Sequence, residues 1–479
     1  MAIILPANTL SGGFSVDNSC RFNDGDSAYM HKTITSGGNE KTWTCSFWIK
    51  LCTPSADDYV FSYAAGSGST ARGDISFQTT DNSLSVEFNP TGSSWTFCKV
   101  SNVKFRDPSA FYNIVVACDT TQGTEANRLK VYINGTQYTL SAYPTLNFDT
   151  GFNSAVQHTV GRYENADSGY IDAYISEFYW IDGTAYAASD FGEFDEDSPT
   201  IWKPKDASGL TFGTNGFYLD FEDSSNLGND ANGGTDLTEV NLAATDSATD
   251  TPTNNFCTLN PLDNYYPSNT LSEGNTQITT GGNYSFLQTT MYLTTGKWYW
   301  EVKAVSKASG GDEYMIGIQG RSSQGTNKPP SMNDGIAYYG VDGDTYKAAA
   351  NNLGASTIVA DYGDAYTAGD IIGVALDLDN NKIYWSKNGT WQDSGDPTSG
   401  ATGTGALSID AASTAEQGGY SPVAGFYDSP TAVFNFNFGS PSITISSGNS
   451  DGDGYGNFEY AVPSGYYAIC TKNLAEYGG

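Results

Sequence analysis

The sequence predicts an all-β protein of at least two domains, and three observations support this fold class. The chain has 479 residues, which exceeds the length at which one hydrophobic core stops growing. Aromatic residues make up 14% of it, with 32 Tyr and 24 Phe among 54 Gly. Aromatic and β-branched residues favour strands, whereas Gly, Asn, Asp and Ser favour the turns between strands. Helix signals are sparse, and strand signals recur at the short spacing typical of sandwiches.

Several segments carry clear strand signals, because apolar and β-branched residues run through them and turn residues flank them. They are Thr42–Lys50, Tyr112–Cys118, Leu129–Ile133, Lys297–Val302, Ile371–Leu378, Lys382–Ser386 and Ala432–Phe438. Asn134-Gly135 and Asn388-Gly389 lie at or just after strand ends. Both residue types tolerate positive φ, so these dipeptides predict tight hairpin turns. Each also lies in an N-x-T sequence, which we interpret as a turn and not as a glycan acceptor.

A domain boundary is expected near Leu242–Asn255, where the sequence LAATDSATDTPTNN is small, polar and interrupted by Pro252. The predicted organisation is one domain over residues 1–245, a linker over 246–257 and a second domain over 258–479.

The cysteines leave one question open. The seven are Cys20, Cys45, Cys52, Cys98, Cys118, Cys257 and Cys470. No CxxC pair occurs and only His31 and His158 are present, which argues against a zinc site. Cys257 in FCTLNPL and Cys470 in ICTKNL share a C-T-x-N pattern that brackets the second domain. Neighbouring terminal strands would bring these two together, as a disulfide in an oxidising medium or as two adjacent thiols.

The net charge of −32 restricts the partners. Nucleic acid and anionic membranes attract clustered Lys and Arg, so neither nucleic-acid binding nor membrane insertion is expected. The acidic surface is expected to keep a dense assembly soluble. The N-terminal sequence MAIILPANTLSGG has no basic region before its short apolar run, so it does not read as a signal peptide. Synthesis in a host cytoplasm and release by a route such as lysis are therefore expected.

The first half resembles a laminin-G-like domain, which is a concanavalin-type β-sandwich. The resemblance rests on Phe22–Lys50 (FNDGDSAYM…TWTCSFWIK), FRDPSAFYNIVVACDTT from Phe105, RLKVYINGTQ from Arg128, and Ile171–Gly183 (IDAYISEFYWIDG). Gly216–Asp236 resembles the strand that usually opens such a domain, yet it comes last here. We expect a permuted sandwich in which this final strand takes the place of the first.

The second half resembles a SPRY domain, which is also a concanavalin-type sandwich. The motifs are Gly296–Val302 (GKWYWEV), Ile316–Ile318 (IGI), Tyr366–Gly389 (YTAGDIIGVALDLDNNKIYWSKNG), Tyr420–Phe426 (YSPVAGF) and Phe436–Gly439 (FNFG). Together the two resemblances imply two tandem concanavalin A-like antiparallel β-sandwiches of the jelly-roll kind.

The tandem arrangement is similar to that of virion-associated proteins of marine bacteriophages. This resemblance implies a tail-fibre, receptor-binding or head-decorating role on the virion surface. It also implies loops that bind a host-surface glycan or protein, contacts with other virion proteins, and a homo-oligomer whose repeated weak sites gain avidity.

A polysaccharide-degrading enzyme of the same superfamily is one alternative, and a bacterial surface adhesin is another. Such glucanases place carboxylates at alternate positions of one strand. Glu193, Asp195 and Asp197 have this spacing, but the sequence around them predicts an acidic loop. Neither histidine has a nucleophile motif nearby. We therefore predict no catalytic residues and a non-enzymatic protein.

Calcium is the one cofactor that the sequence suggests, because loops rich in Asp and Asn supply hard oxygen ligands. One candidate loop contains Asn449, Asp451, Asp453 and Asn457, although the Glu that should close it falls one place early at Glu459. The other contains Asp223, Asn226, Asp230 and Asn232. A Gly/Asp-rich hairpin tip is the alternative for the first loop.

Exposed loop aromatics are the candidate ligand-binding residues, since their rings can pack on a sugar or a protein. They are Trp95, Tyr338, Tyr339, Tyr362 and Trp391. Partly buried loop anchors are the alternative. The strand aromatics Trp48, Trp180, Trp298, Trp300 and Trp385 are expected in the cores.

Overall fold

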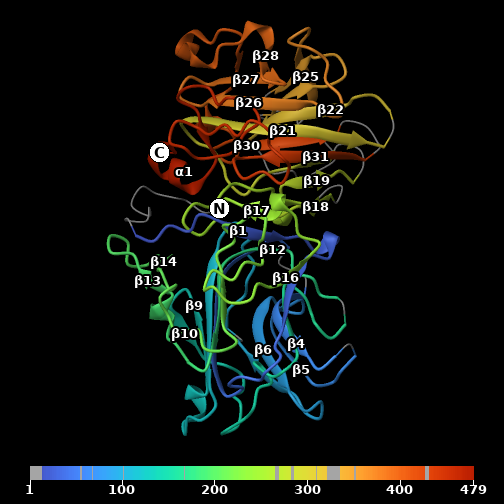
Figure 1. Cartoon of the computed structure of the whole chain (residues 1–479). Helices are drawn as coiled ribbons and strands as arrows, with labels where there is room; N and C mark the ends of the chain where they lie inside the picture. Colours follow the sequence, from blue (N-terminus) through green and yellow to red (C-terminus); the bar gives the residue numbers. More distant parts are fainter. Residues whose placement is uncertain are drawn as a thin grey trace. The chain divides into compact units, whose positions relative to one another are not determined.

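The computed structural model describes residues 13–53, 57–66, 68–100, 102–166, 168–264, 269–281, 285–308, 310–320, 335–349, 352–426 and 431–478. It divides into two compact units, with the division between Asn254 and Asn255 (Figure 1). We call them the N-terminal sandwich and the C-terminal sandwich. Both are built almost entirely of antiparallel strands, so the all-β prediction is confirmed.

The N-terminal sandwich consists of two main sheets. The first has the order β10 (Thr136–Tyr138), β9 (Leu129–Ile133), β8 (Tyr112–Asp119), β3 (Thr42–Leu51), β12 (Ala173–Asp182), β1 (Ser19–Phe22) and β17 (Ser247–Ala248), with β15 (Phe217–Leu219) also paired to β12. The second has the order β16 (Thr238–Val240), β2 (Tyr29–Thr33), β11 (Gln157–Val160), β4 (Asp58–Ala64), β5 (Arg72–Gln78), β6 (Ser83–Asn89) and β7 (Thr96–Lys99). A separate ribbon pairs β13 (Gly192–Phe194) with β14 (Trp202–Pro204).

The C-terminal sandwich repeats this plan. Its first sheet has the order β18 (Thr270–Ser272), β19 (Gln277–Thr279), β31 (Ala432–Asn437), β21 (Lys297–Lys307), β26 (Ile371–Asp377), β27 (Lys382–Lys387) and β28 (Thr390–Trp391), with β29 (Leu407–Ser408) on β27 and β32 (Tyr467–Ala468) on β21. Its second has the order β20 (Ser285–Leu287), β30 (Ser421–Phe426), β22 (Tyr314–Gln319), β23 (Ile336–Tyr339), β24 (Thr345–Ala349) and β25 (Asn352–Val359).

Helices are short in the described part of the chain. One α-helix, α1 (Thr471–Tyr477), lies near the C-terminus. The 3₁₀ turns are η2 (Asp24–Asp26), η3 (Glu125–Asn127), η4 (Ala188–Asp190), η5 (Ala244–Asp246), η6 (Pro261–Asp263), η8 (Gln392–Ser394), η9 (Pro397–Thr402) and η10 (Ala412–Thr414). None of the helices in this part has the length and apolar character that a membrane crossing requires.

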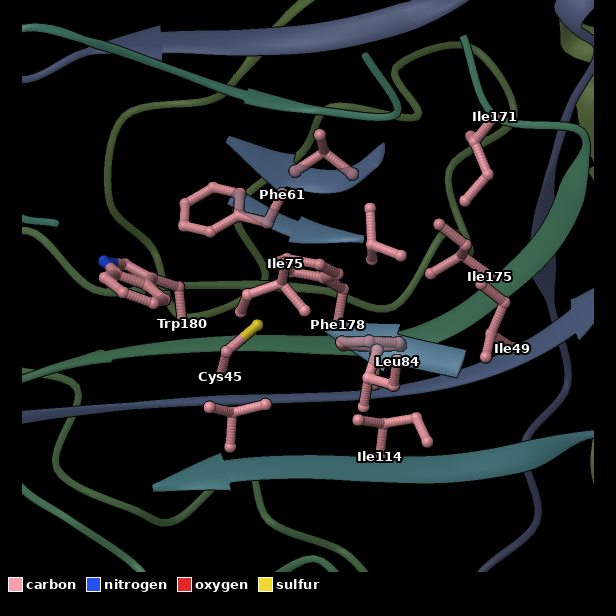
Figure 2. Close-up of a cluster of buried hydrophobic side chains, with 14 of the residues drawn as sticks. Cys45, Ile49, Phe61, Ile75, Leu84, Ile114, Ile171, Ile175, Phe178 and Trp180 are labelled. Carbon is pink, nitrogen blue, oxygen red and sulfur yellow. The ribbon is translucent and has the colours of Figure 1, made fainter. Parts of the chain in front are cut away.

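The core of the N-terminal sandwich lies between its two sheets, because alternate residues of each strand point inward. Figure 2 shows side chains such as Phe61 and Ile75 facing Trp180 and Cys45 of the other sheet. The ring of Trp180 lies 4.7 Å from that of Phe61, centroid to centroid. Its indole N–H donates to Asn153 Oδ1 at 2.9 Å, so the one polar atom of this ring is satisfied. Truncating an aromatic side chain at such a site costs about 3–5 kcal/mol.

The C-terminal core follows the same logic. Trp298, Trp300 and Trp385 are fully buried, as predicted for strand aromatics. The indole N–H of Trp385 on β27 donates to the Ile316 carbonyl of the opposite sheet at 3.0 Å. The hydroxyl of Tyr366 contacts the carbonyls of Tyr314 and Tyr338 at 3.0 and 2.9 Å.

Both Asn-Gly dipeptides form the predicted turns. Asn134 and Asn388 have φ of 46° and 47°, and the glycines after them have φ of 76° and 80°. The two turns also make the same hydrogen bonds to the neighbouring strand. Asn134 Oδ1 accepts from the Asn113 N–H at 2.8 Å, and Asn388 Oδ1 accepts from the Ile371 N–H at 2.9 Å. Each turn therefore fixes the end of a hairpin against the next strand.

The late strands of the N-terminal sandwich lie beside its earliest ones. β15, from the segment expected to replace the first strand, pairs with β12, while β16 pairs with β2 and β17 with β1. The segment predicted as a linker, 246–257, therefore differs from an open connection. Asp250 and Thr251 are buried, and the Ser19 hydroxyl donates to the Asp250 carbonyl at 2.6 Å. The small polar side chains that suggested a linker are used in hydrogen bonds to the sandwich.

Candidate functional site

The second sheet of the N-terminal sandwich has an unusual solvent side. Strands β5 and β6 alternate strictly, so Ile75 and Phe77 point into the core while Arg72, Asp74 and Ser76 point outward. We call the outward side of β4–β7 the outer face. Such a face is ordinarily a solvated polar surface, but Asp74, Ser76, Ser62 and Ser85 are all buried here. Other side chains cover them, which makes the outer face a built structure.

A row of rings and one guanidinium crosses the outer face from β4 to β7. Tyr59 and Tyr163 stack with centroids 4.4 Å apart, and Trp95 and Phe97 stack at 5.3 Å. Arg72 links the two stacks, because its Cζ lies 5.5 Å from the Tyr163 ring and 4.9 Å from the Trp95 ring. Cation–π contacts of this kind hold a guanidinium against aromatic faces. We call these five residues the aromatic row.

The aromatic row ends in a ring that faces solvent. Phe97 on β7 is 50% exposed, and Trp95 beside it is half-buried. An exposed ring held in a fixed stack is a surface that a ligand can cover at little entropic cost.

Beneath the row lies a pair of carboxyl groups. Asp74 on β5 and Glu87 on β6 stand directly opposite each other in the antiparallel register. The Ser76 hydroxyl donates to Asp74 Oδ1 at 2.7 Å, and the Ser85 hydroxyl donates to Glu87 Oε1 at 2.8 Å. Burial, and then the neighbouring charge of Glu87, raise the pKa of Asp74 to about 8. Burial also raises the pKa of Glu87. The pair therefore retains a proton at neutral pH, as close like charges require.

The other end of the face is covered by the segment that follows β11. The Arg162 guanidinium lies 3.8 Å from the Tyr29 ring, and its Nη2 contacts Glu164 Oε2 at 2.7 Å. Glu164 also accepts from Gln157 Nε2 at 3.0 Å and from the Thr159 hydroxyl. These groups satisfy one another over β11 and β2, so the accessible end of the face is the one at β7. His31 lies on this covered end, where burial lowers its pKa.

The structure places some of the predicted ligand-binding aromatics at the surface and buries the others. Trp95 belongs to the aromatic row. Tyr338, Tyr339 and Tyr362 were expected as exposed loop residues, and that expectation is wrong, because all three are buried. Tyr338 lies on β23 and faces the core, and the Tyr362 hydroxyl donates to the Gly405 carbonyl at 3.1 Å. Trp391 is half-buried, with its ring 6.5 Å from that of Tyr299.

The first predicted calcium loop uses its oxygens internally. Asp451 Oδ1 accepts from the backbone N–H groups of Asp453 and Tyr455, and its Oδ2 accepts from Ala468 N and Asn473 Nδ2. Asp453 Oδ2 accepts from the Tyr477 hydroxyl at 2.9 Å. The remaining two predicted ligands, Asn449 and Asn457, hold the loop through bonds to Phe458 and to Gly439. This loop therefore fastens the C-terminal segment and resembles a structural turn more than a ligand cage.

The second predicted calcium loop behaves similarly. Asp223 Oδ1 accepts from the backbone and hydroxyl of Ser225, and Asn226 Nδ2 donates to Asp236. Asp230 Oδ1 accepts from the backbone N–H groups of Tyr218 and Asn232. Across the part of the chain that the structure describes, no three His, Cys, Asp or Glu side chains converge closely enough to hold a metal ion.

Two further predictions concern the cysteine pair Cys257 and Cys470 and the acidic triplet at positions 193, 195 and 197. Phe256, and not Cys257, stands opposite Cys470 in an isolated bridge. Cys257 packs in the main C-terminal core and Cys470 in a separate outer cluster, so the two thiols lie on opposite sides of this pairing, and of the two alternatives the register does not favour the disulfide. In the acidic triplet, Asp195 is buried with its Oδ2 at 3.5 Å from Lys203 Nζ, while Glu193 is exposed on the β13–β14 ribbon. Glu193 Oε1 also lies 3.8 Å from Lys203 Nζ, so these two carboxyls form an ion-pair cluster around one lysine.

Sequence reasoning missed Arg72, Asp74, Glu87 and Phe97. Their signal was present, because RGDISFQ and SLSVEFN alternate polar and apolar residues in the manner of half-buried strands. The sequence does not show that the polar side of these strands is covered, because the covering residues come from distant segments such as 161–166.

Comparison with known proteins agrees with this description. Residues 23–188 match the concanavalin A-like lectin/glucanases superfamily, and residues 297–436 match the SPRY domain. The chain therefore carries a laminin G-like, concanavalin A-like domain followed by a SPRY domain. Domains of these two kinds are typically non-catalytic binding modules.

Individual relatives share only parts of their length with this chain. Ran-binding protein 9 of Danio rerio is 37% identical over 97 residues, which are 20% of this chain and 14% of that protein. Ran-binding protein 10 of Danio rerio is 38% identical over 97 residues, with the same coverage. Among solved structures, the SPRY domain of human HERC1 is 18% identical with a TM-score of 0.29, covering 37% of this chain and 96% of that one. Mouse laminin alpha1 domains LG4-5 are 9% identical with a TM-score of 0.30, covering 98% and 90%.

Proposed function

We propose that this protein is a non-enzymatic binding protein that captures a host-surface glycan or protein through the outer face of its N-terminal sandwich. The observation that carries the proposal is the aromatic row, which ends in the half-exposed ring of Phe97. A sugar ring or an apolar side chain can pack on Phe97 and Trp95. Arg72 and Glu87 are partly exposed close by and supply polar groups that orient a ligand.

The outer face is suited to recognition because it is held in place before a ligand arrives. The carboxyls are fixed by serine hydroxyls, and the guanidinium is fixed between two rings. A site of this kind loses little side-chain entropy on binding, which favours affinity. Repetition of the chain in a homo-oligomer would add avidity to each weak contact.

A polysaccharide-degrading activity is disfavoured by the burial of Asp74. Glycosidases need two carboxyls that reach the scissile bond from opposite sides. Asp74 is 2% exposed and lies beneath the row, so it contributes to the electrostatics of the face and does not reach a glycosidic oxygen. The C-terminal SPRY domain is proposed to serve as the second binding module, toward other virion proteins.

The proposed place of action is the surface of a bacteriophage virion, in a tail fibre, a receptor-binding tip or a head decoration. The tandem of two binding domains and the net charge of −32 support this placement, because a crowded particle surface requires rigid and mutually repelling modules. Mass spectrometry of particles purified from a lysate of the source culture tests it. The chain is expected among the particle proteins; its presence only in host envelope fractions would instead indicate an adhesin.

Binding itself is tested on an array of neutral and acidic oligosaccharides with the whole chain. Binding to at least one class is expected, and the Phe97→Ala variant should lose that signal. Phe194→Ala is the matched control, because Phe194 is a similarly exposed ring, 47% exposed, on the β13–β14 ribbon of the same sandwich. Equal signals from wild type and Phe97→Ala, or loss in Phe194→Ala alone, would contradict the proposed face.

A further inference from the structure

A buried lysine and a buried aspartate meet on the other sheet of the N-terminal sandwich. Lys50 lies on β3, and Asp250 lies two residues beyond the end of β17. The Lys50 Nζ contacts Asp250 Oδ2, and each side chain is only 1% exposed. By contrast, Lys297, which pairs with Asp377 in the C-terminal sandwich, keeps a 26% exposed side chain. Both partners of the Lys50–Asp250 pair are therefore shielded from water, whereas in the Lys297–Asp377 pair only Asp377 is.

Aromatic rings surround the pair. The Lys50 Nζ lies 4.8 Å from the centroid of the Tyr174 ring and 5.4 Å from that of Phe111. Tyr174 is the cross-strand neighbour of Lys50 in the β3–β12 register. Two full charges in such surroundings carry a large desolvation cost, which their mutual attraction offsets only in part.

A second carboxyl stands on the same side of β12. Asp172 lies two residues before Tyr174, so its side chain points to the same face as Tyr174 and Lys50. It is buried, and its Oδ2 accepts from the Thr53 hydroxyl at 2.6 Å. Asp172, Lys50 and Asp250 all influence the pKa of the buried Cys52 thiol, so the pair has an acidic neighbour in the same cluster.

We propose that Lys50 and Asp250 become joined by an amide bond between their side chains. The Nζ lone pair, freed by transfer of a proton from the ammonium group, attacks Asp250 Cγ. The Nζ–Cγ bond forms and one Cγ–O bond breaks. Two of the three ammonium protons leave with that oxygen as water, and the third stays on the amide nitrogen. The reaction is a condensation, so it needs no oxidant, reductant or further reactant.

The proposed role of Asp172 is to relay protons. It accepts a proton from the ammonium group and returns it to the departing oxygen. The product replaces two buried charges with one neutral amide, which lowers the cost of burying this cluster. The bond would close a loop between positions 200 residues apart and tie the last segment of the sandwich to its central strand β3.

Intact-protein mass spectrometry of the whole chain tests the proposal. Wild type is expected to be lighter than its sequence mass by one water molecule, and proteolysis should yield a branched peptide joining Lys50 to Asp250. The Lys50→Arg variant keeps the charge pair but cannot form this amide, so it should have the full sequence mass. Lys297→Arg is the matched control and should keep the deficit of wild type.

Two further measurements separate this bond from other losses of water. An Asp-Gly succinimide, as at Asp451-Gly452, has the same mass deficit but disappears on treatment with hydroxylamine, whereas the side-chain amide persists. Asp172→Asn should slow formation at least tenfold in freshly refolded protein. A wild-type chain at its full sequence mass that gives linear peptides on both sides of Lys50 and Asp250 would overturn the proposal.

Discussion

The two sandwiches share a topology but differ on one face. In the N-terminal sandwich the first sheet runs β9-β8-β3-β12-β1, and in the C-terminal sandwich it runs β27-β26-β21-β31-β19, so each strand has a counterpart. Their second sheets correspond in the same way, with β11-β4-β5-β6 matching β30-β22-β23-β24. Yet the outward side of β5 and β6 carries Arg72, Asp74 and Glu87, whereas the counterpart side of β23 and β24 carries Ala337, Tyr339 and Tyr346 in a small apolar cluster of its own.

This difference separates the residues that every such sandwich needs for its core from those that are free to vary. The inward residues of both sandwiches are large and apolar, because both must bury two sheets against each other. The outward residues of these strands are released from that requirement. In the N-terminal sandwich they form a polar face with exposed rings, and in the C-terminal sandwich they are buried again. The proposal of ligand recognition on the N-terminal outer face follows from this difference.

Asp250→Ala is expected to have the largest effect on the N-terminal sandwich. It leaves the Lys50 ammonium buried with its principal partner removed, which should lower the free energy of unfolding by about 3–5 kcal/mol. Lys297→Ala should cost less, because the lysine side chain is 26% exposed and Asp377 keeps two hydrogen bonds from Asn380. Denaturant unfolding followed by fluorescence measures both, and equal costs would remove the distinction between the two pairs.

Asp74→Asn sharpens the comparison through pH. The folded pKa of Asp74, about 8, lies above the value of an unfolded aspartate, so the folded state binds more protons than the unfolded state between these values. Stability should therefore fall as pH rises from about 4 to 8, and remain low above that. Asn mimics the protonated acid, so the variant should be clearly more stable than wild type at pH 9 and similar to it near pH 4. Denaturant unfolding of both proteins at the two pH values measures this, and an equal difference in stability between variant and wild type at pH 4 and pH 9 would contradict it.

The apolar counterpart face is tested by Tyr339→Ala. Loss of this buried ring should destabilise the C-terminal sandwich by about 3 kcal/mol and leave oligosaccharide binding unchanged.

Phe97→Ala should do the reverse, with a stability change within about 0.5 kcal/mol because half of its ring is already exposed. Its affinity for the best oligosaccharide of the array should fall about tenfold, a loss of about 1.4 kcal/mol. Calorimetric titration and thermal unfolding of both variants give the four values.

The last expected effect concerns the Asn-Gly turns, which the two sandwiches share. Asn134→Ala and Asn388→Ala each place alanine at a φ near +46° and remove a side-chain acceptor, which should cost about 1–2 kcal/mol at either turn. Costs that differ by more than about 1 kcal/mol would show that the two turns are not equivalent. Gly at either position should recover part of the loss, because glycine adopts positive φ without strain.

The sequence predicted the fold well because its signals are local. Strand segments such as Leu129–Ile133 and the Asn-Gly turns follow from residue type and spacing alone, and the structure has them at the same positions. The burial of Tyr338 and Tyr362 could not be read in this way, since it depends on Trp385 and Gly405, which come from other strands and loops. The candidate site was predicted only through Trp95. Its other members lie in strands, where an outward polar residue ordinarily indicates nothing more than solvent.

Hydroxyl-radical footprinting of the whole chain tests the outer face most directly. The chain is oxidised alone and with the oligosaccharide that gives the strongest array signal, and oxidation is measured at individual side chains. The account predicts protection of Trp95 and Phe97, with Phe194 and Trp391 oxidised to the same extent in both samples. Protection of Trp391 or Phe194 while Trp95 and Phe97 stay fully reactive would contradict it.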